Sequence, residues 1–294
     1  MSKRKIIHMF QWKLSDIKEN LQNIKNSGYT HIQISPVTPT KQPESNEYWL
    51  LYQPIDFTIG NNLGSKEEFI DLCGEAHEIG LQIITDVVIR HLAGRDDGSL
   101  YPHEKCNPKI ANKREYWLDP INASNYWDRY QVCYRCTGTP TLDYNNQELL
   151  NTYILPFLDE VLTYADGLRI DEAKHFALEY EGSQFWKIIS ERYSNKFLYG
   201  ECIFIDQNLF DDYANYINVL TNSLPSRNKH RAVVFFESHD TFKTFKYTCW
   251  MDNQTRLHEY EKLLQEYDSV LFYARPFDDL IFSEDIKKIN FKYK

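Results

Sequence analysis

The 294-residue sequence has little that would suit a membrane or a nucleic acid. It contains no apolar run approaching the roughly 18 residues of a membrane-spanning helix, and its basic start, MSKRKIIHMF, lacks the apolar region of a signal peptide. Its 42 acidic residues outnumber its 33 basic ones, and the net charge of −9 argues against nucleic acid or an anionic membrane as the main partner. We therefore expect a cytoplasmic protein whose six cysteines stay reduced.

Internal repeats, low-complexity tracts and a glycine-rich phosphate loop after an apolar segment are also missing from the sequence. The chain has instead 42% hydrophobic and 15% aromatic residues, enough for a sizeable core in one large domain or two ordinary ones. Flat aromatic faces suit flat ligands such as sugar rings, although they suit a protein core equally well.

Eight short apolar segments alternate with segments of helical periodicity. We predict strands at residues 5–10, 31–34, 82–88, 166–170, 196–200, 217–220, 231–236 and 269–274. We predict helices at residues 14–26, 65–79, 147–164, 184–193, 208–216, 254–267 and near 283–288, the second opening on a capping box of Ser65 and Glu68. This alternation is typical of a closed parallel (β/α)8 TIM barrel. The alternative is an open doubly wound sheet, which usually carries the missing phosphate loop.

Residues 92–140 interrupt this alternation after the third predicted strand. The stretch is rich in Asn, Asp, Pro, Tyr and Cys and has little periodicity. A loop of this length inside a compact domain is usually functional or a small subdomain. We therefore predict a catalytic barrel of residues 1–91 and 141–294, with residues 92–140 as a small subdomain inserted between strand 3 and helix 3.

Polar side chains follow the ends of the predicted strands, and in a TIM barrel these ends form the active-site face. The residues at these ends are Gln11, Trp12, Ser35, Asp86, His91, Arg169, Asp171, Glu201, His239 and Asp240. Arg169 and Asp171 lie two residues apart in GLRIDEAKH (residues 167–175), so their side chains point the same way. We expect Arg169 to lower the pKa of Asp171, which suits a nucleophile, although a structural ion pair gives the same pattern.

Three carboxylates, Asp171, Glu201 and Asp240, are predicted to close the fourth, fifth and seventh strands and to share one pocket. Glycoside hydrolysis needs two carboxyl groups beside the scissile bond, one ionised and one protonated. Glu201 has no obvious cation nearby in the sequence, so we expect it to be the acid. His91 and His239 offer hydrogen bonds to sugar hydroxyls, but each alone is equally explained as a packed core residue.

Six sequence motifs in this order resemble those of the alpha-amylase family of glycoside hydrolases. They are YWLLYQP (48–54), DVVIRH (86–91), GLRIDEAKH (167–175), GEC (200–202), ESHD (237–240) and FYARP (272–276). The resemblance implies a retaining enzyme acting on α-1,4-linked glucans such as starch, glycogen or maltooligosaccharides. A transglycosylase, or an inactive carbohydrate-binding scaffold on the same barrel, remains an alternative.

The resemblance also implies roles for individual residues. Asp171 would be the nucleophile, Glu201 the acid/base, and Asp240 the third carboxylate that stabilises the transition state. The residues implied around the sugar are Arg169, His91, His239, Tyr52 and Trp49, with Lys174 and His175 towards the leaving group. The β-sandwich that usually follows the eighth helix in this family is apparently absent from the sequence.

Two departures from the family pattern concern calcium. Arg90 stands where calcium-binding members usually have Asn, and Thr141 stands where they usually have Asp. Arg is always charged and has no acceptor atom, so we expect no calcium at this site and no other cofactor. We expect the Arg90 guanidinium to replace the ion, donating to backbone carbonyls of residues 133–143 and to Asp143. An arginine pointing to solvent is the alternative.

A possible zinc site lies in the inserted stretch. HEKC and CYRC give the spacings H-x2-C and C-x2-C through His103, Cys106, Cys133 and Cys136. Such short motifs often arise by chance, so four unrelated residues are the alternative.

Overall fold

The computed structural model describes residues 3–244 and 251–293, and in it eight parallel strands close into a barrel in sequence order. The strands are β1 (Arg4–Met9), β2 (His31–Ile34), β3 (Gln82–Val87), β4 (Gly167–Ile170), β5 (Phe197–Glu201), β6 (Asn218–Thr221), β7 (Ala232–Phe235) and β8 (Ser269–Tyr273). Each predicted strand is present to within one residue at either end. The barrel prediction is therefore confirmed and the open-sheet alternative is wrong.

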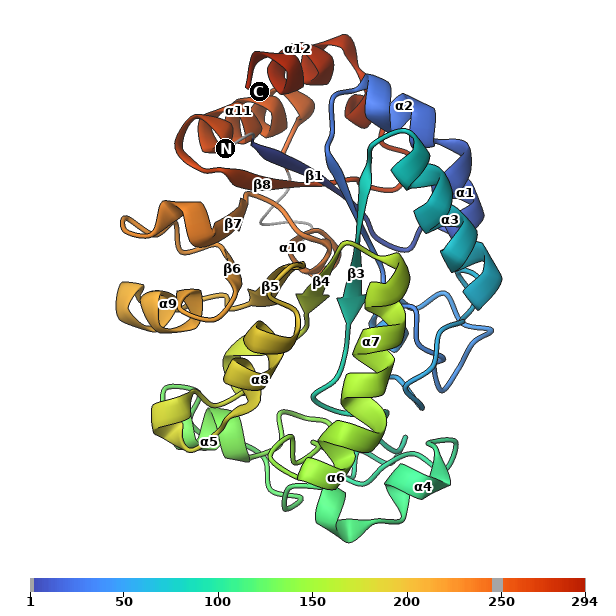
Figure 1. Ribbon diagram of the computed structural model, residues 1–294, viewed down its shortest axis with the longest axis vertical. Coiled ribbons are helices and arrows are strands. Elements are labelled where there is room, and N and C mark those ends of the chain that lie inside the picture. The colour runs from blue at the N-terminus through green and yellow to red at the C-terminus, as the bar shows by residue number, and fades with distance from the viewer. Residues whose placement is uncertain (1–2, 245–250, 294) are drawn as a thin grey trace.

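Helices surround the barrel on its outside (Figure 1). They are α1 (Leu14–Glu19), α2 (Leu21–Asn26), α3 (Lys66–Glu78), α6 (Gln147–Leu149), α7 (Leu155–Tyr164), α8 (Phe185–Arg192), α9 (Gln207–Ala214), α11 (Asn253–Glu266) and α12 (Glu284–Lys292). Helix α10 (His239–Thr244) lies instead inside this ring, after β7. The capping box of α3 is confirmed, with Ser65 Oγ accepting from the Glu68 N–H and Glu68 Oε2 accepting from the Ser65 N–H.

Three helical segments differ from the prediction. The helix expected at 14–26 is divided at Asn20, whose ψ of 0° departs from helical geometry. The helix expected at 147–164 contains a π-helical turn, η3 (Leu150–Ile154), between α6 and α7. Helix α10 was not predicted, because its residues follow β7 so closely that they read as the end of the strand.

The barrel interior has an apolar layer of side chains and, closer to the carboxyl ends of the strands, a polar layer. Seven side chains form the apolar layer, namely Ile6, Ile84, Tyr199, Leu220, Val233, Phe235 and Leu271. Because every second residue of a strand faces inward, His8, Asp86, Glu201 and Tyr273 form the next layer towards the carboxyl ends of the strands. The apolar layer fills the barrel interior, and the polar layer next to it contains the groups that can do chemistry.

The stretch 92–140 contains the short elements α4 (Pro108–Ala111), η2 (Arg114–Tyr116) and α5 (Arg129–Tyr134). Its buried side chains, including Ile110 and Tyr116, join those of the barrel helices in one hydrophobic core. Figure 1 shows α4, α5 and α6 together at one end of the molecule, opposite the chain termini. The stretch thus extends the core of the barrel.

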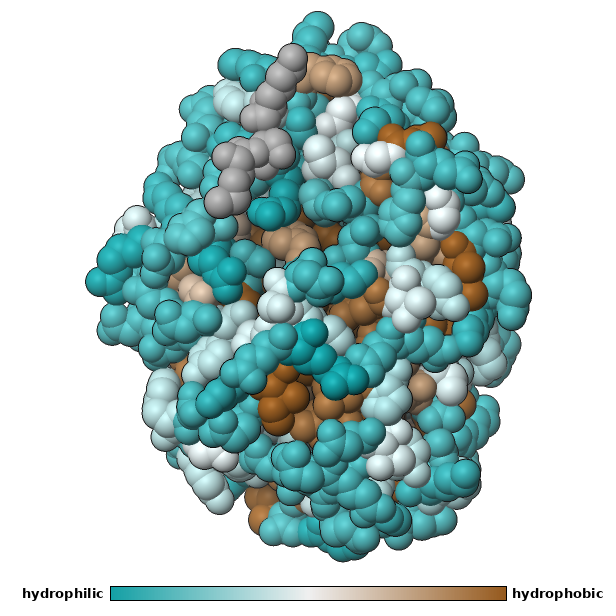
Figure 2. Space-filling view, in the orientation of Figure 1, coloured by the Kyte–Doolittle hydropathy of each residue, from teal (hydrophilic) through white to brown (hydrophobic). Residues whose placement is uncertain are grey.

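The face of the molecule shown in Figure 2 is mostly hydrophilic, with hydrophobic side chains in small separate patches. Among the residues that the structure describes, no helix has the length and apolarity needed to cross a lipid bilayer.

Candidate active site

Arg169 lies at the centre of the polar layer and is almost completely buried. Its Nη1 donates to Asp86 at 2.9 Å (Oδ1) and 3.1 Å (Oδ2), and to Asp171 Oδ1 at 2.7 Å. Its Nη2 lies 2.5 Å from Glu201 Oε1. One guanidinium therefore joins carboxylates from β3, β5 and the residue after β4; we call these four residues the Arg169 cluster.

The Arg169 cluster has three carboxyl groups for one guanidinium, and burial has the largest effect on the protonation of Asp86 and Asp171. Burial raises the pKa of Asp86 to about 6, although Arg169 and Tyr52 favour its ionised form. Burial also raises the pKa of Asp171 well above its ordinary value, with Arg169 opposing and Glu201 adding to the rise. The predicted effect of Arg169 on Asp171 has the right sign, but the predicted net lowering is wrong because burial outweighs it.

Glu201 has a cation beside it, contrary to the prediction from its sequence neighbours. The register of the parallel pair β4–β5 places Arg169 opposite Tyr199 and Ile170 opposite Gly200, so Arg169 reaches Glu201 across the strands. The Glu201 side chain is also less buried than that of Asp171, with exposed fractions of 16% and 9%. A contact made between strands is invisible to local sequence inspection.

Asp240 lies on the same rim of the barrel but on a different kind of element from the one predicted. Strand β7 ends at Phe235, and Asp240 belongs to the first turn of α10. Its side chain is 48% exposed, and its Oδ1 lies 3.5 Å from His239 Nε2. Asp240 therefore stands at the open side of the site, where a ligand can reach it.

Aromatic and histidine side chains form one wall of the Arg169 cluster. Tyr52 Oη donates to Asp86 Oδ2 at 2.9 Å and lies 2.9 Å from His239 Nε2. The Phe10 ring stacks on the His239 ring with 4.3 Å between centroids. His91 Nε2 lies 2.8 Å from the Tyr52 carbonyl oxygen. The structure thus brings Tyr52, His91 and His239 together beside the carboxylates.

The other implied substrate residues lie further out. Trp49 belongs to η1 (Tyr48–Tyr52), is 44% exposed, and its ring centroid is 5.7 Å from Lys41 Nζ. Lys174 lies in η4 (Ala173–His175) and donates from Nζ to the Ile203 carbonyl at 3.0 Å.

His175 is buried, and its Nδ1 lies 3.2 Å from the Val132 carbonyl of α5. Burial lowers the pKa of His175 to about 4, so its ring is neutral at physiological pH. This contact ties the loop after β4 to the stretch 92–140.

His8 was missed as a member of the site. Its pKa lies well below the ordinary value because the ring is buried, and its ring centroid is 5.3 Å from that of His239. Neither ring nitrogen has a hydrogen-bond partner among the described residues. The available signal was a lone polar residue in an apolar strand, as in KIIHMF for His8 and in QIITDVV for Asp86.

Arg90 is fully buried, so the prediction that it points into the protein is confirmed and the solvent-facing alternative is wrong. Its Nη2 donates to the carbonyls of Val132 and Arg135, each at 3.0 Å. The predicted contact with Asp143 is replaced by Glu172, whose Oε2 lies 3.7 Å from Arg90 Nε. Arg90 thus links the end of β3 to α5 through backbone carbonyls.

Glu172 was also missed in the sequence, and it adopts the left-handed conformation with φ of 49°. Burial alone would raise its pKa, but His91, whose Nδ1 lies 3.7 Å from Glu172 Oε2, and the charge of Arg90 hold the pKa well below its ordinary value. Glu172 is therefore ionised and serves as the counterion of Arg90. Its acidity distinguishes it from its neighbour Asp171.

The zinc prediction is wrong, because its four residues contact different groups. His103 faces Asp96, Cys106 donates to the Ala93 carbonyl, Cys133 lies near Glu181, and Cys136 donates to the Asp119 carbonyl. Within residues 3–244 and 251–293, no group of three His, Cys, Asp or Glu side chains is arranged to hold a metal ion. The described cysteines, Cys73, Cys106, Cys133, Cys136 and Cys202, are buried and free.

Comparison with known sequences gives one consistent result. The family model described as the alpha-amylase catalytic domain matches residues 12–268. An alpha-amylase of Clostridium acetobutylicum is 30% identical over 214 residues, which are 67% of this chain and 28% of that protein. An alpha-amylase-related protein of Drosophila lini is 29% identical over 59% of this chain and 37% of that protein. The chain thus spans well under half the length of these relatives.

Comparison with solved structures gives the same fold. The alpha-amylase of Geobacillus thermoleovorans, complexed with acarbose, has a TM-score of 0.76 and 17% identity, covering 98% of this chain and 77% of that chain. Alpha-amylase I of Eisenia fetida has a TM-score of 0.75 and 17% identity, covering 94% and 68%.

Proposed function

The chain belongs to the alpha-amylase family, and from this premise we propose that it is a retaining glycoside hydrolase of α-1,4-glucosidic bonds in starch, glycogen or maltooligosaccharides. The observation that carries the proposal is the contact of one guanidinium, Arg169, with both Asp171 and Glu201. Retention of configuration requires two neighbouring carboxyl groups, about 5–5.5 Å apart. Two carboxyl groups on a single guanidinium are necessarily neighbours.

The two carboxyl groups need opposite protonation states. Burial raises the pKa of Asp171, so in this proposal its ionised form depends on the charge of Arg169, which lowers that pKa. In the proposal, Asp171 attacks the anomeric carbon as a carboxylate oriented by Arg169 Nη1. Glu201, the more exposed of the two, donates a proton to the leaving oxygen and later activates the water that hydrolyses the glycosyl-enzyme.

The groups around the two carboxyls would hold the sugar in place. Asp240 would accept hydrogen bonds from ring hydroxyls at the open side, and His91 and His239 would donate to others. Tyr52 would offer a flat face beside the reacting ring. In this proposal no cofactor takes part, and Arg90 takes the role of a structural calcium by tying the end of β3 to α5.

Incubation with maltoheptaose, followed by chromatography and by NMR of the new reducing ends, tests the proposal. Hydrolysis with retention gives shorter chains whose first-formed reducing ends are α. Longer products would instead indicate a transglycosylase, and unchanged substrate a binding scaffold. Asp171→Asn is the matched control, because it removes the nucleophile and keeps the size of the side chain.

A further inference from the structure

A cavity of about 520 Å³ lies at the amino ends of the strands, at the end of the barrel opposite to the Arg169 cluster. Its volume is within the range of roughly 300–1,000 Å³ that is usual for ligand sites. The lining includes the first residues of β1, β3, β5 and β6, which are Arg4, Gln82, Phe197 and Asn218. No candidate catalytic residue lines this space. We call it the amino-end cavity.

Alternation along the strands turns two arginines towards the amino-end cavity. On β1, Ile6 belongs to the apolar layer of the barrel, so Arg4, two residues earlier, also faces inward. The same alternation places Arg231, directly before β7, on the inward face. The Arg4 guanidinium lies over the Phe197 ring, 4.3 Å from its centroid. The barrel therefore has a second charged layer, which apolar side chains separate from the Arg169 cluster.

Neither of these two half-buried guanidiniums forms an ion pair with a carboxylate within residues 3–244 and 251–293. Arg4 Nη1 donates to Ser269 Oγ at 3.5 Å, and Arg231 Nε donates to the Ala214 carbonyl at 2.9 Å. Burial lowers the pKa of Arg231, and the charge of Arg4 lowers it further because the two like charges repel each other. An anion bound between the two side chains would relieve this repulsion.

Lys196 is a third cation in the lining of the amino-end cavity, and Asp166 and Asp268 are its two carboxylates. Asp166 already has a partner in His77, whose Nε2 lies 2.8 Å from Asp166 Oδ2. Burial lowers the pKa of Arg4, and the charge of Asp268 opposes this effect only in part. Three cations and two carboxylates leave the cavity with a net positive charge, in a chain whose own net charge is −9.

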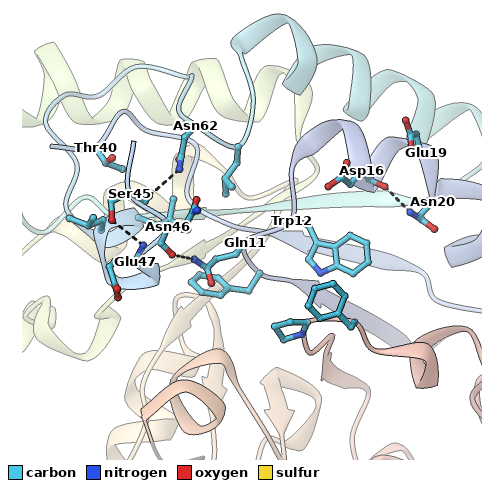
Figure 3. A pocket seen from close by; sticks show the side chains of 16 residues that line it. Gln11, Trp12, Asp16, Glu19, Asn20, Thr40, Ser45, Asn46, Glu47 and Asn62 are labelled. Atoms are coloured by element: carbon cyan, nitrogen blue, oxygen red, sulfur yellow. Dashed lines mark hydrogen bonds between the residues drawn. The ribbon is translucent and has the colours of Figure 1, made fainter. Parts of the chain in front are cut away.

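This positive charge distinguishes the amino-end cavity from the cavity of about 620 Å³ that Figure 3 shows beside the candidate active site. That second cavity is lined by Asp16, Glu19 and Glu47, and none of the described residues in its lining is Lys, Arg or His. Carboxylates without a nearby cation repel an anionic ligand. Of these two cavities, only the amino-end cavity therefore suits an anion.

We propose that the amino-end cavity binds a small phosphorylated molecule through its phosphate group. Arg4 and Arg231 would donate to the phosphate oxygens from their planar guanidiniums, and Lys196 would supply a third positive charge. The cavity is larger than a phosphate ion, and the polar side chains of Gln82 and Ser194 in its lining can hydrogen-bond the rest of the ligand. Such binding is independent of the proposed hydrolase activity, because the apolar layer lies between this cavity and the candidate catalytic carboxyls.

Isothermal titration of the protein with ribose 5-phosphate, inorganic phosphate and ribose tests the site. We expect ribose 5-phosphate to bind more tightly than inorganic phosphate, and ribose to give no measurable heat of binding. Arg4→Gln and Arg231→Gln should each weaken binding of ribose 5-phosphate by roughly tenfold or more, because each removes charged hydrogen bonds to the phosphate. Arg227→Gln is the matched control, because Arg227 is an exposed arginine that pairs with Asp211 outside the cavity.

Two further variants keep the test decisive. Arg4→Lys retains the charge if Arg4→Gln does not fold, and the loss of the planar guanidinium should still weaken binding several-fold. Asp171→Asn should bind ribose 5-phosphate with unchanged affinity, because Asp171 lies at the other end of the barrel. Unchanged affinity in the Arg4 and Arg231 variants, equal binding of ribose, or loss of binding in Asp171→Asn would overturn the site. Equal affinity for ribose 5-phosphate and inorganic phosphate would overturn its assignment to a phosphorylated organic molecule.

Discussion

Two buried clusters of arginine and carboxylate lie within the same barrel, and they differ in charge balance. The Arg169 cluster has three carboxyl groups for one guanidinium. The second, the Glu237 cluster, consists of Glu237, Asp278, Arg256 and Arg275. In it Arg275 Nη2 lies 2.6 Å from Glu237 Oε1, and Arg256 Nη2 lies 2.6 Å from Asp278 Oδ2. Two positive charges there face two negative ones.

This difference in charge balance distinguishes a cluster that stabilises the fold from one that can take part in catalysis. In the Glu237 cluster each carboxylate has a guanidinium partner, so its charges are balanced. An excess of buried carboxylates cannot ionise completely, so some groups stay protonated near neutral pH. Both clusters are buried, so charge balance is what distinguishes them, and in the Arg169 cluster burial of the excess carboxyls raises the pKa of Asp86 and Asp171.

The largest expected effect is the loss of turnover in Asp171→Asn and in Glu201→Gln. Each variant removes one of the two carboxyl roles, so we expect activity to fall by roughly 10³-fold or more. Far-UV circular dichroism and the melting temperature should stay close to those of the unmodified protein. A folded Asp171→Asn protein with near-normal activity would be incompatible with the proposed mechanism.

Glu237→Gln should lower the stability of the fold, whereas Asp171→Asn and Glu201→Gln should lower activity. It leaves Arg256 and Arg275 with one carboxylate between them, and breaking a buried ion pair costs about 3–5 kcal/mol. Urea unfolding measures this loss of unfolding free energy. Glu266→Gln is the control, because its ion pair with Lys229 is exposed to solvent and should contribute little to stability.

Arg90→Ala tests whether an arginine next to the active site can still be structural. It leaves the carbonyls of Val132 and Arg135 without their donor, and we expect a loss of about 2–4 kcal/mol. Hydrogen exchange should show the loss first in α5. A calcium chelator should change neither activity nor melting temperature. A chelator-induced loss that added Ca²⁺ restores would show that Arg90 does not replace the ion.

The smallest expected effect is the pH dependence of stability caused by Asp86. Its pKa is raised from 3.8 to about 6 in the folded protein, so the folded state binds this proton more tightly than the unfolded state. The resulting stabilisation is complete below about pH 4 and is lost as the pH rises to about 6, by roughly 1–3 kcal/mol. Asp86→Asn should remove this dependence when unfolding is measured from pH 4 to 7.

Asp159 provides a control of opposite sign for this experiment. The hydrogen bond from Arg192 lowers the pKa of Asp159, so its contribution is present at neutral pH and is lost on acidification. Asp159→Asn should therefore reduce stability at pH 7 and have little effect at low pH. Equal pH profiles for the Asp86 and Asp159 variants would contradict the assignment of charge imbalance to the Arg169 cluster.

The sequence was sufficient where the determinants of structure are local and periodic. Strand ends, the Ser65 capping box and the position of Asp171 follow from alternation and capping, and all are observed. The sequence was insufficient where a contact depends on strand register or a pKa depends on burial in the folded structure. Register brings Arg169 to Glu201, and burial reverses the expected pKa shift of Asp171. The zinc motif failed because two matching spacings do not bring their residues together.

The buried cysteines make the folding of this chain observable without any added label. Burial raises the pKa of Cys106 to about 11 and those of Cys73 and Cys133 to about 12. Thiol reagents react with the thiolate, so these side chains become reactive only when the backbone around them opens. Cys73 belongs to α3, while Cys106 and Cys133 belong to the stretch 92–140. The order in which these cysteines are alkylated would thus show which part of the chain unfolds first.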